Sequence, residues 1–150
     1  MKLGFASDHR GLKLKNELME YFKDKYELVD VGTYTEDSCD YPDYAKALGD
    51  KILNKEVDFG VAICGSGIGI SIALNKMQGI YCAKVSTNDE AVHTREDNNT
   101  NVIAFGETMD LEEAKLAVET FINTPYSNLE KHNRRINLIS NYELGEYHDR

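Results

Sequence analysis

A cysteine is followed by three alternating glycines in the segment Ile63-Cys64-Gly65-Ser66-Gly67-Ile68-Gly69. An apolar run that predicts a strand precedes the glycines, and an apolar stretch that predicts a helix follows them. Such glycines let a ligand approach the backbone closely, and the free N–H groups at a helix start favour an anion. A helix N-terminus also favours the thiolate form of a nearby cysteine. The pattern therefore predicts an anion site beside a reactive Cys64.

Two other interpretations of this segment stay open. Free cysteines are among the most buried residues, so Cys64 taken alone fits a small apolar side chain at a strand end. The glycines also come near the G-x-G-x-x-G fingerprint of dinucleotide-binding proteins, and Asp89 follows about twenty residues later, where an acid could bind a ribose. However, the spacing is G-x-G-x-G and it follows the third predicted strand, so the match is poor.

Composition and charge limit the classes of function. The chain has 150 residues and a net charge of −9, from 26 acidic and 17 basic residues. One domain is expected at this length. The acidic balance argues against nucleic-acid binding, which needs a basic face, but a local basic cluster can still bind a phosphorylated ligand.

The cysteines and the apolar runs indicate a compartment. Cys39, Cys64 and Cys82 are widely spaced without a CxxC motif, which predicts free thiols in a reducing compartment and no zinc site. No apolar run reaches the ~18 residues of a membrane span, and the first residues do not resemble a signal peptide. We expect a cytoplasmic protein with no membrane segment and no metal.

Short apolar runs alternate with amphipathic stretches along the whole chain. Strands are expected at residues 3–6, 27–31, 59–63, 80–85 and 101–105. Helices are expected at residues 11–25, 42–53, 68–75, 89–97, 111–122 and 128–140. The alternation predicts an α/β fold: a single doubly wound, Rossmann-like, five-stranded parallel sheet with helices on both faces and a C-terminal helix. We expect one domain over residues 1–150, with about 143–150 as a tail.

Ligands of such sheets bind beyond the carboxyl ends of the strands. These ends are expected at residues 7–9, 64–69, 86–88 and at Gly106. A separate basic cluster lies in the last predicted helix, where Lys131 and Arg135 are spaced i, i+4 and His132 and Arg135 i, i+3. One helix face can thus present several donors to an anion, although a solvated charged face has the same pattern.

Several segments together resemble the ribose-5-phosphate isomerase B family, which includes allose-6-phosphate isomerase and the two subunits of galactose-6-phosphate isomerase. The resemblance extends from Lys2 to about Tyr142, and the pair Asp8-His9 combined with C-G-[ST]-G-x-G is its most specific part. The segments are Ser7-Asp8-His9-Arg10-Gly11, Val31-Gly32-Thr33, Asp40-Tyr41-Pro42, 63–72, 98–106 and His132-Asn133-Arg134-Arg135.

The resemblance implies an aldose–ketose isomerase of the pentose phosphate pathway that works through an enediolate without metal or cofactor. It implies a homodimer or tetramer with active sites at the interface between subunits. Cys64 would be the base that moves a proton between C1 and C2, and Ser66 would help to open the sugar ring. The enediolate oxygen would be held by the backbone amides of Gly65, Ser66, Gly67, Ile68 and Gly69.

The remaining roles implied by the resemblance concern substrate binding. Asp8 and His9 would bind the sugar hydroxyls or the ring oxygen, although Asp8 also suits a helix cap. Asn98 would contact the substrate. The phosphate would be held by Lys131, His132 and Arg135.

The sequence departs from the family in two places. Asp97 stands where many members have the histidine that opens the ring, and an ordinary aspartate is a poor general acid near neutrality. Three explanations compete: a partly buried Asp97 does the work, His93 reaches the same place from one helical turn earlier, or His9 and Ser66 suffice. The second departure is that no arginine follows Gly106, where members often place one for the phosphate.

The end of the chain resembles one galactose-6-phosphate isomerase subunit. Two alternatives to a ribose-5-phosphate isomerase therefore stay open. One is an isomerase of a six-carbon aldose phosphate, such as allose or galactose 6-phosphate. The other is a sugar-phosphate binding subunit that works only with a different partner chain.

Overall fold

Five parallel strands form one sheet in the order β2-β1-β3-β5-β4 in the computed structural model, which describes residues 1–146. The strands are β1 (Lys2–Ser7), β2 (Glu27–Asp30), β3 (Phe59–Cys64), β4 (Cys82–Lys84) and β5 (Val102–Gly106). The helices are α1 (Leu12–Phe22), α2 (Tyr41–Leu53), α3 (Ile68–Asn75), α4 (Asn88–Asn98), α5 (Leu111–Asn123) and α6 (Glu130–Glu143). The predicted doubly wound α/β fold is confirmed.

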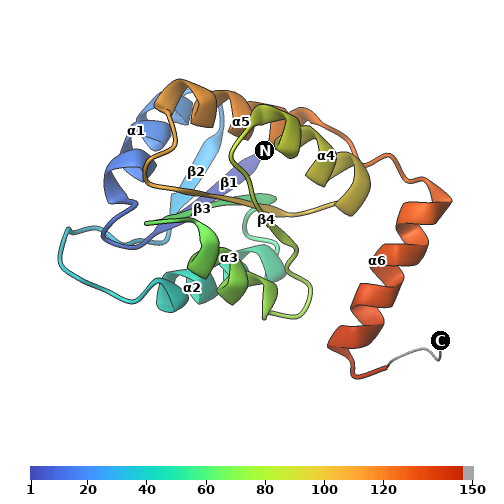
Figure 1. Ribbon diagram of the computed structural model, residues 1–150. Coiled ribbons are helices and arrows are strands. Elements are labelled where there is room, and N and C mark those ends of the chain that lie inside the picture. Colours follow the sequence, from blue (N-terminus) through green and yellow to red (C-terminus); the bar gives the residue numbers. More distant parts are fainter. Residues whose placement is uncertain (147–150) are drawn as a thin grey trace.

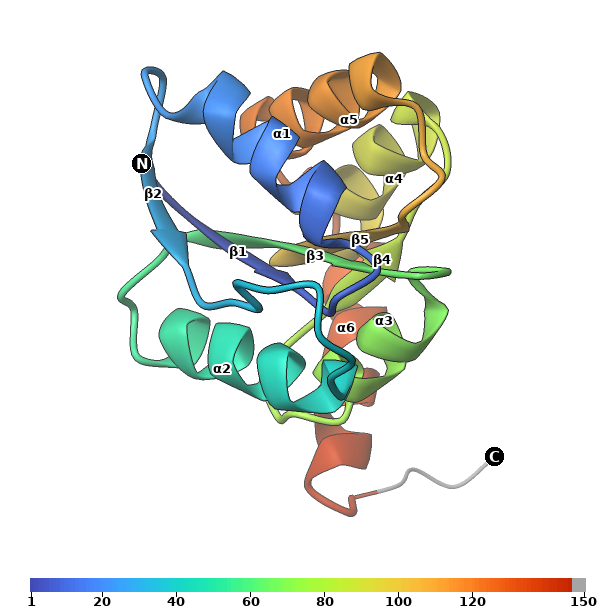
Figure 2. The ribbon, with the colours of Figure 1, turned by 90° about the vertical axis from the view of Figure 1, so that its left-hand side faces the viewer.

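Helices cover both faces of the sheet (Figures 1 and 2). Figure 2 shows α1, α4 and α5 on one face and α2 and α3 on the other. The central strands β3 and β5 are almost wholly buried, as expected for parallel strands that are covered on both sides. Phe5 and Phe105 belong to the core beneath α1 and α5, and Leu48 and Ile70 to the core beneath α2 and α3.

The predicted element boundaries hold to within a few residues, with two informative differences. β4 has three residues rather than six, because it is an edge strand that pairs with β5 alone, and Tyr81 before it bonds instead to the Asn101 side chain. α6 begins two residues later than expected, because Asn128 has a φ of 57°, which no right-handed helix contains. No helix among residues 1–146 is long and apolar enough to cross a membrane.

A fully buried lysine anchors the loop that follows β2. Lys15 Nζ in α1 donates to Asp30 Oδ1 at 2.5 Å and to the carbonyl oxygen of Thr33 at 2.6 Å. A buried ammonium group needs such partners, since an unpaired one would be very costly. The ion pair therefore fixes the start of the loop that leads to α2 and passes beside the sheet's carboxyl edge.

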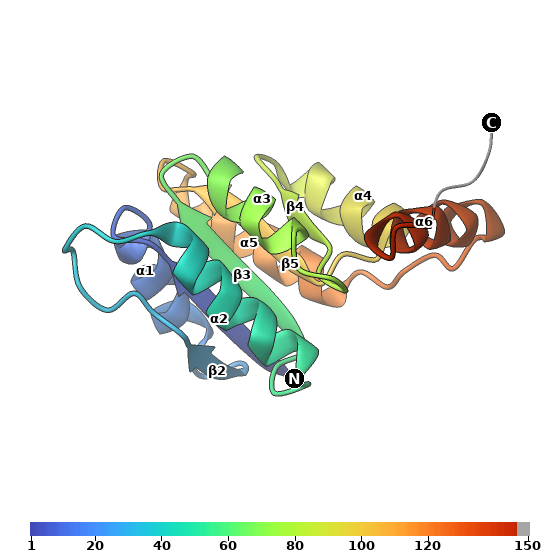
Figure 3. The same cartoon turned by 90° about the horizontal axis from the view of Figure 1, so that it is seen from below.

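The last helix stands apart from the layers. Figures 1 and 3 show α6 beyond α4, outside the sheet edge formed by β4. None of its residues is buried, and Ile139 and Leu144 at its end are 43% and 61% exposed. Of the expected C-terminal tail, residues 147–150 lie outside the described part of the chain. An amphipathic helix with an uncovered apolar side is typical of a surface that another chain covers.

Candidate active site

A cavity of about 570 Å³ lies beyond the carboxyl ends of β1 and β3, which are neighbours in the sheet. The chain leaves β1 into α1 on one face and β3 into α3 on the other, so this is the switch point where ligands of such sheets bind. The cavity is lined by Asp8, Arg10, Tyr41, Cys64, Gly65, Ser66, Ile68 and Gly69.

Cys64 is the last residue of β3 and is both part of the core and part of the cavity wall. It is only 4% exposed and packs with the core beneath α2 and α3. Its Sγ accepts a hydrogen bond from the backbone N–H of Gly67 at 3.2 Å. This hydrogen bond fixes the sulfur at the wall of the cavity, next to the start of α3. The interpretation of Cys64 as a buried apolar side chain is therefore compatible with its place at a ligand site.

The three glycines of the loop serve different purposes. Only Gly67 has a positive φ, of 78°, and a Cβ there would lie 2.6 Å from the carbonyl carbon of Phe105. Gly69 instead makes room for Tyr41, whose ring would lie 2.6 Å from a Cβ. Close packing, more than unusual dihedral angles, thus explains the alternation of glycines.

Not all amides of the loop are free to bind a ligand oxygen. Gly67 N–H points at Cys64 Sγ, and Ile68 N–H donates to Ser66 Oγ at 3.1 Å. The N–H groups of Gly65 and Ser66 have no acceptor among the described residues. Two neighbouring N–H groups beside the thiol are an arrangement that can hold an oxyanion.

Asp8 and His9 are held in place by backbone hydrogen bonds. Asp8 Oδ1 accepts the N–H groups of Arg10 and Gly11, each at 3.0 Å, and so caps the turn before α1 while the side chain also lines the cavity. His9 Nδ1 accepts the N–H of Cys39 at 3.2 Å. This bond places the proton of a neutral His9 ring on Nε2.

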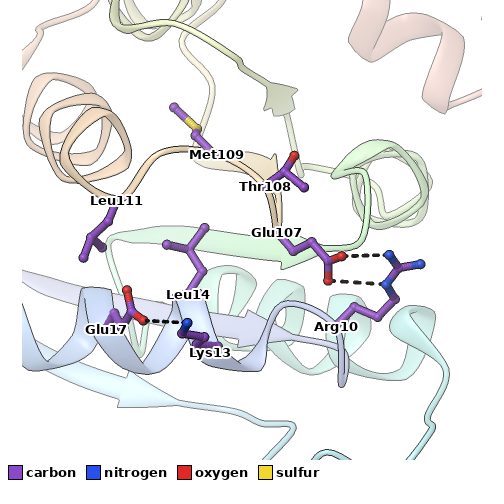
Figure 4. A pocket seen from close by; sticks show the side chains of 8 residues that line it. All are labelled: Arg10, Lys13, Leu14, Glu17, Glu107, Thr108, Met109 and Leu111. Atoms are coloured by element: carbon purple, nitrogen blue, oxygen red, sulfur yellow. Dashed lines mark hydrogen bonds and ion pairs between the residues drawn. The ribbon is translucent and has the colours of Figure 1, made fainter.

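An ion pair between Arg10 and Glu107 stands between the Cys64 cavity and a neighbouring hollow, which Figure 4 shows, and was not predicted from the sequence. Arg10 Nη2 lies 2.7 Å from Glu107 Oε1, and Nε lies 3.3 Å from Oε2. The pair raises the pKa of Arg10 and lowers the pKa of Glu107, so both stay charged. Tyr41 also lines the cavity, although the sequence assigned no role to it. The segment Asp40-Tyr41-Pro42, which is part of the family resemblance, could have pointed to this residue.

The other predicted site residues form a second group around α4 and α6. Asp97 Oδ1 lies 3.3 Å from His132 Nε2, and the side chain of His132 is only 12% exposed. Asn98 lines a hollow of about 210 Å³ between β4, α4 and α6. Lys131 and Arg135 are exposed on α6, and neither has an ion-pair partner among the described residues. No member of this group lines the Cys64 cavity of its own chain.

Side chains along α4 differ in how firmly their surroundings fix them. Arg95 orders the end of α4, because its Nη1 donates to the Thr100 carbonyl oxygen at 2.6 Å and to Asn99 Oδ1 at 3.0 Å. Burial lowers the pKa of Arg95. His93, by contrast, is exposed on α4 and has no partner in the described part of the chain. The geometry therefore favours Asp97 over His93 as an ordered group.

Titratable side chains that could bind a metal do not converge. Among residues 1–146, no three side chains of histidine, cysteine, aspartate or glutamate cluster as a metal site would require. The third cysteine, Cys82, lies away from the cavity, and burial raises the pKa of its thiol.

Comparison with known proteins places this geometry in context. Residues 3–139 match the family described as Ribose/Galactose Isomerase. The chain is 38% identical to ribose-5-phosphate isomerase B of Escherichia coli over 144 residues, which cover 95% of this chain and 96% of that protein. Its fold resembles ribose-5-phosphate isomerase B of Clostridium thermocellum with a TM-score of 0.93 and 36% identity, covering 97% and 99% of the two chains.

A second similar structure contains a ligand. Ribose-5-phosphate isomerase B of Mycoplasma genitalium with bound ribulose-5-phosphate has a TM-score of 0.88 and 35% identity to this chain. The similar parts cover 95% of this chain and 96% of that one. The similarity therefore includes nearly the whole fold on which the Cys64 cavity is built.

We predict that Gly67→Ala lowers the free energy of unfolding by more than about 3 kcal/mol, since the new methyl group would meet the backbone of β5. Gly145→Ala is the matched control, because Gly145 has a similar φ of 76° but open space around it. Strain alone should cost about 1 kcal/mol there. Urea unfolding of both variants measures the difference, and equal losses would show that the backbone contact is not limiting.

Proposed function

The chain belongs to the ribose/galactose isomerase family, and from this premise we propose that it interconverts ribose 5-phosphate and ribulose 5-phosphate. It is an aldose–ketose isomerase that acts on a sugar phosphate. The five-carbon substrate is supported by the similar proteins from Escherichia coli and Clostridium thermocellum, which are both named ribose-5-phosphate isomerase B. Its place is then in the pentose phosphate pathway of the cytoplasm.

The hydrogen bond from Gly67 N–H to Cys64 Sγ is the observation that carries the proposed mechanism. A thiolate at this position removes the proton from C2 of the open-chain aldose, and the electron pair moves toward the C1 oxygen to give an enediolate. The same sulfur then returns the proton to C1, the C1 oxygen takes up the proton that the C2 hydroxyl gives up, and the C2 oxygen becomes the ketone. One group can perform both steps because C1 and C2 are neighbouring atoms, so the same sulfur can reach each of them.

The negative charge of the enediolate needs stabilisation outside water. The free N–H groups of Gly65 and Ser66 lie directly after Cys64 in the chain and support this role. Donors that are already oriented stabilise a developing oxyanion without reorganisation during the reaction. The N–H of Ile68 already donates to Ser66 Oγ, so Ile68 and Gly69 do not both act as donors to the enediolate. Both residues instead line the wall of the cavity.

Ring opening must precede proton transfer, since ribose 5-phosphate is mostly cyclic. Asp97 is the group that we assign to this step, because its contact with His132 orders it. The other assignments have less support: His93 is exposed and has no partner among residues 1–146, and His9 and Ser66 already accept backbone hydrogen bonds.

A complete site requires the residues of the Cys64 cavity together with those around α4 and α6. Within one chain, these two groups of residues are separated. The Cys64 cavity contains the proposed base, whereas Lys131, His132 and Arg135 on α6 supply the cations for a phosphate. A homodimer in which α6 of one subunit reaches the cavity of the other would unite them. The uncovered apolar side chains of α6 support such an interface.

Two alternatives are separated from this proposal by simple assays. An isomerase of allose or galactose 6-phosphate would turn over six-carbon substrates faster than ribose 5-phosphate. A binding subunit of a heteromeric enzyme would bind the sugar phosphate but show no turnover alone. The presence of Cys64, Asp97 and the α6 cations in one chain favours a self-sufficient enzyme.

We expect Cys64→Ala to lower kcat for ribose 5-phosphate by about 10²–10⁴-fold, the usual contribution of a positioned acid–base group. Cys64→Ser should fall similarly, because a hydroxyl does not ionise near neutrality. Exchange of the C2 hydrogen with deuterated water should be lost in parallel. EDTA should leave the unaltered enzyme unaffected. A Cys64→Ala enzyme with full activity would rule out the cysteine as base.

The ring-opening assignment predicts different effects for two positions on α4. Asp97→Ala should lower kcat/KM for ribose 5-phosphate by about 10-fold or more, whereas His93→Ala should stay within about twofold. Both variants should fold normally by circular dichroism, since neither side chain is buried. If His93→Ala is the slower enzyme, the assignment reverses, and if neither is slower, both assignments fail.

The interface proposal predicts complementation between inactive chains. Cys64→Ala and Arg135→Ala proteins refolded together should recover about a quarter of the unaltered activity, because half of the dimers are mixed and each mixed dimer has one intact site. A mixture of Cys64→Ala with Asp8→Ala should recover none, since both changes lie in the same cavity. Absence of recovery, with mixed dimers verified by mass, would exclude a shared site.

A further inference from the structure

Arg10 is the only positively charged side chain among the described residues that line the Cys64 cavity. The chain as a whole is acidic, with a net charge of −9, and Asp8 brings a further negative charge to the same wall. A phosphorylated ligand that enters this cavity therefore meets one cation of the same chain. Because Arg10 lies in the turn between β1 and α1, its position is set by the sheet itself.

One edge of the Arg10 guanidinium is occupied and another is open. Nε and Nη2 donate to the two carboxylate oxygens of Glu107, whereas Nη1 has no partner among residues 1–146. Figure 4 shows the third nitrogen of the guanidinium pointing away from Glu107. Two N–H groups of Nη1 are thus available to an acceptor that comes from the other side.

The ion pair is fixed to the same loop that holds Cys64. The backbone N–H of Glu107 donates to the carbonyl oxygens of Cys64 at 3.0 Å and Gly65 at 3.2 Å. The Arg10 side chain packs over Gly65, where a Cβ would lie 3.3 Å from Cζ. An exposed arginine is usually mobile, but these contacts hold its guanidinium at a defined place beside the proposed base.

We propose, on the basis of the proposed function, that Arg10 is a substrate-binding residue whose open guanidinium edge donates hydrogen bonds to the phosphate of the sugar phosphate. Glu107 is the positioning residue that holds the guanidinium from its opposite edge. A planar guanidinium matches the oxygens of a phosphate, and two N–H groups on one side suffice for such a contact. The cations of α6 would bind the same phosphate from the partner subunit.

The test uses ribitol 5-phosphate, which has the phosphate and hydroxyls of the substrate but no carbonyl and therefore no turnover. Calorimetry should show that Arg10→Gln raises the Kd of the enzyme for ribitol 5-phosphate by about 10-fold or more, the usual effect of losing a hydrogen bond to a charged group. The Ki of inorganic phosphate should rise likewise. Lys13→Gln is the matched control, because Lys13 has the same charge as Arg10 and lies one helical turn further along the chain. Lys13 lines the neighbouring hollow that Figure 4 shows, but it does not line the Cys64 cavity. Its Kd should stay within about twofold.

A double variant tests the part played by Glu107. If Glu107 acts through Arg10, Glu107→Gln in the Arg10→Gln background should not change the Kd further. Equal Kd values for Arg10→Gln and the unaltered enzyme would overturn the proposal, as would a loss for ribitol 5-phosphate without a loss for inorganic phosphate. An unaltered chain that binds ribitol 5-phosphate but turns over no ribose 5-phosphate would refute only the isomerase function. An unaltered chain that does not bind ribitol 5-phosphate would overturn both.

Discussion

Backbone contact between the loop after β3 and the end of β5 holds the candidate active site together. Gly67 lies against the backbone of Phe105, and a Cβ on Gly106 would lie 3.0 Å from the carbonyl oxygen of Gly65. The N–H of Glu107 bonds to the same loop. With no side chains between them, the two segments leave little freedom to each other. The direction of the Gly67 N–H toward Cys64 and the place of the Arg10–Glu107 pair both follow from this contact.

Much of this arrangement could be predicted from the sequence, because it depends on local pattern. Continuous apolar runs identify β3 and β5 as covered strands, and the glycine loop marks a strand-to-helix turn at the carboxyl edge of a sheet. The bounds of α3 agree with the expectation. β4 was harder to delimit, because the length of an edge strand depends on how far its one neighbour extends, and no periodicity in the strand itself records that.

Contacts between distant segments could not be predicted in this way. Arg10 and Glu107 are 97 residues apart in the chain. They meet because β1 and β5 lie on either side of β3, so the turns that follow the two strands reach the same edge of the sheet. The strand order would have been needed to see this. The position of α6 is a similar case, since the sequence predicts the helix and its basic face, but its separation from the Cys64 cavity depends on the route of residues 124–129 past α4.

The division of the cavity between backbone and side chains has a consequence for how such an enzyme can change over generations. The surface nearest Cys64 is made of peptide groups held by close glycine contacts, and few single substitutions there leave the loop intact. The outer wall is made of exposed or partly exposed side chains such as Arg10, Tyr41 and Glu107, which can be exchanged without disturbing the core. Selection can therefore alter the size and charge of the ligand that this fold accepts while the proposed reactive centre around Cys64 stays unaltered. A family member can thus evolve to bind a different sugar phosphate while it keeps the same reaction.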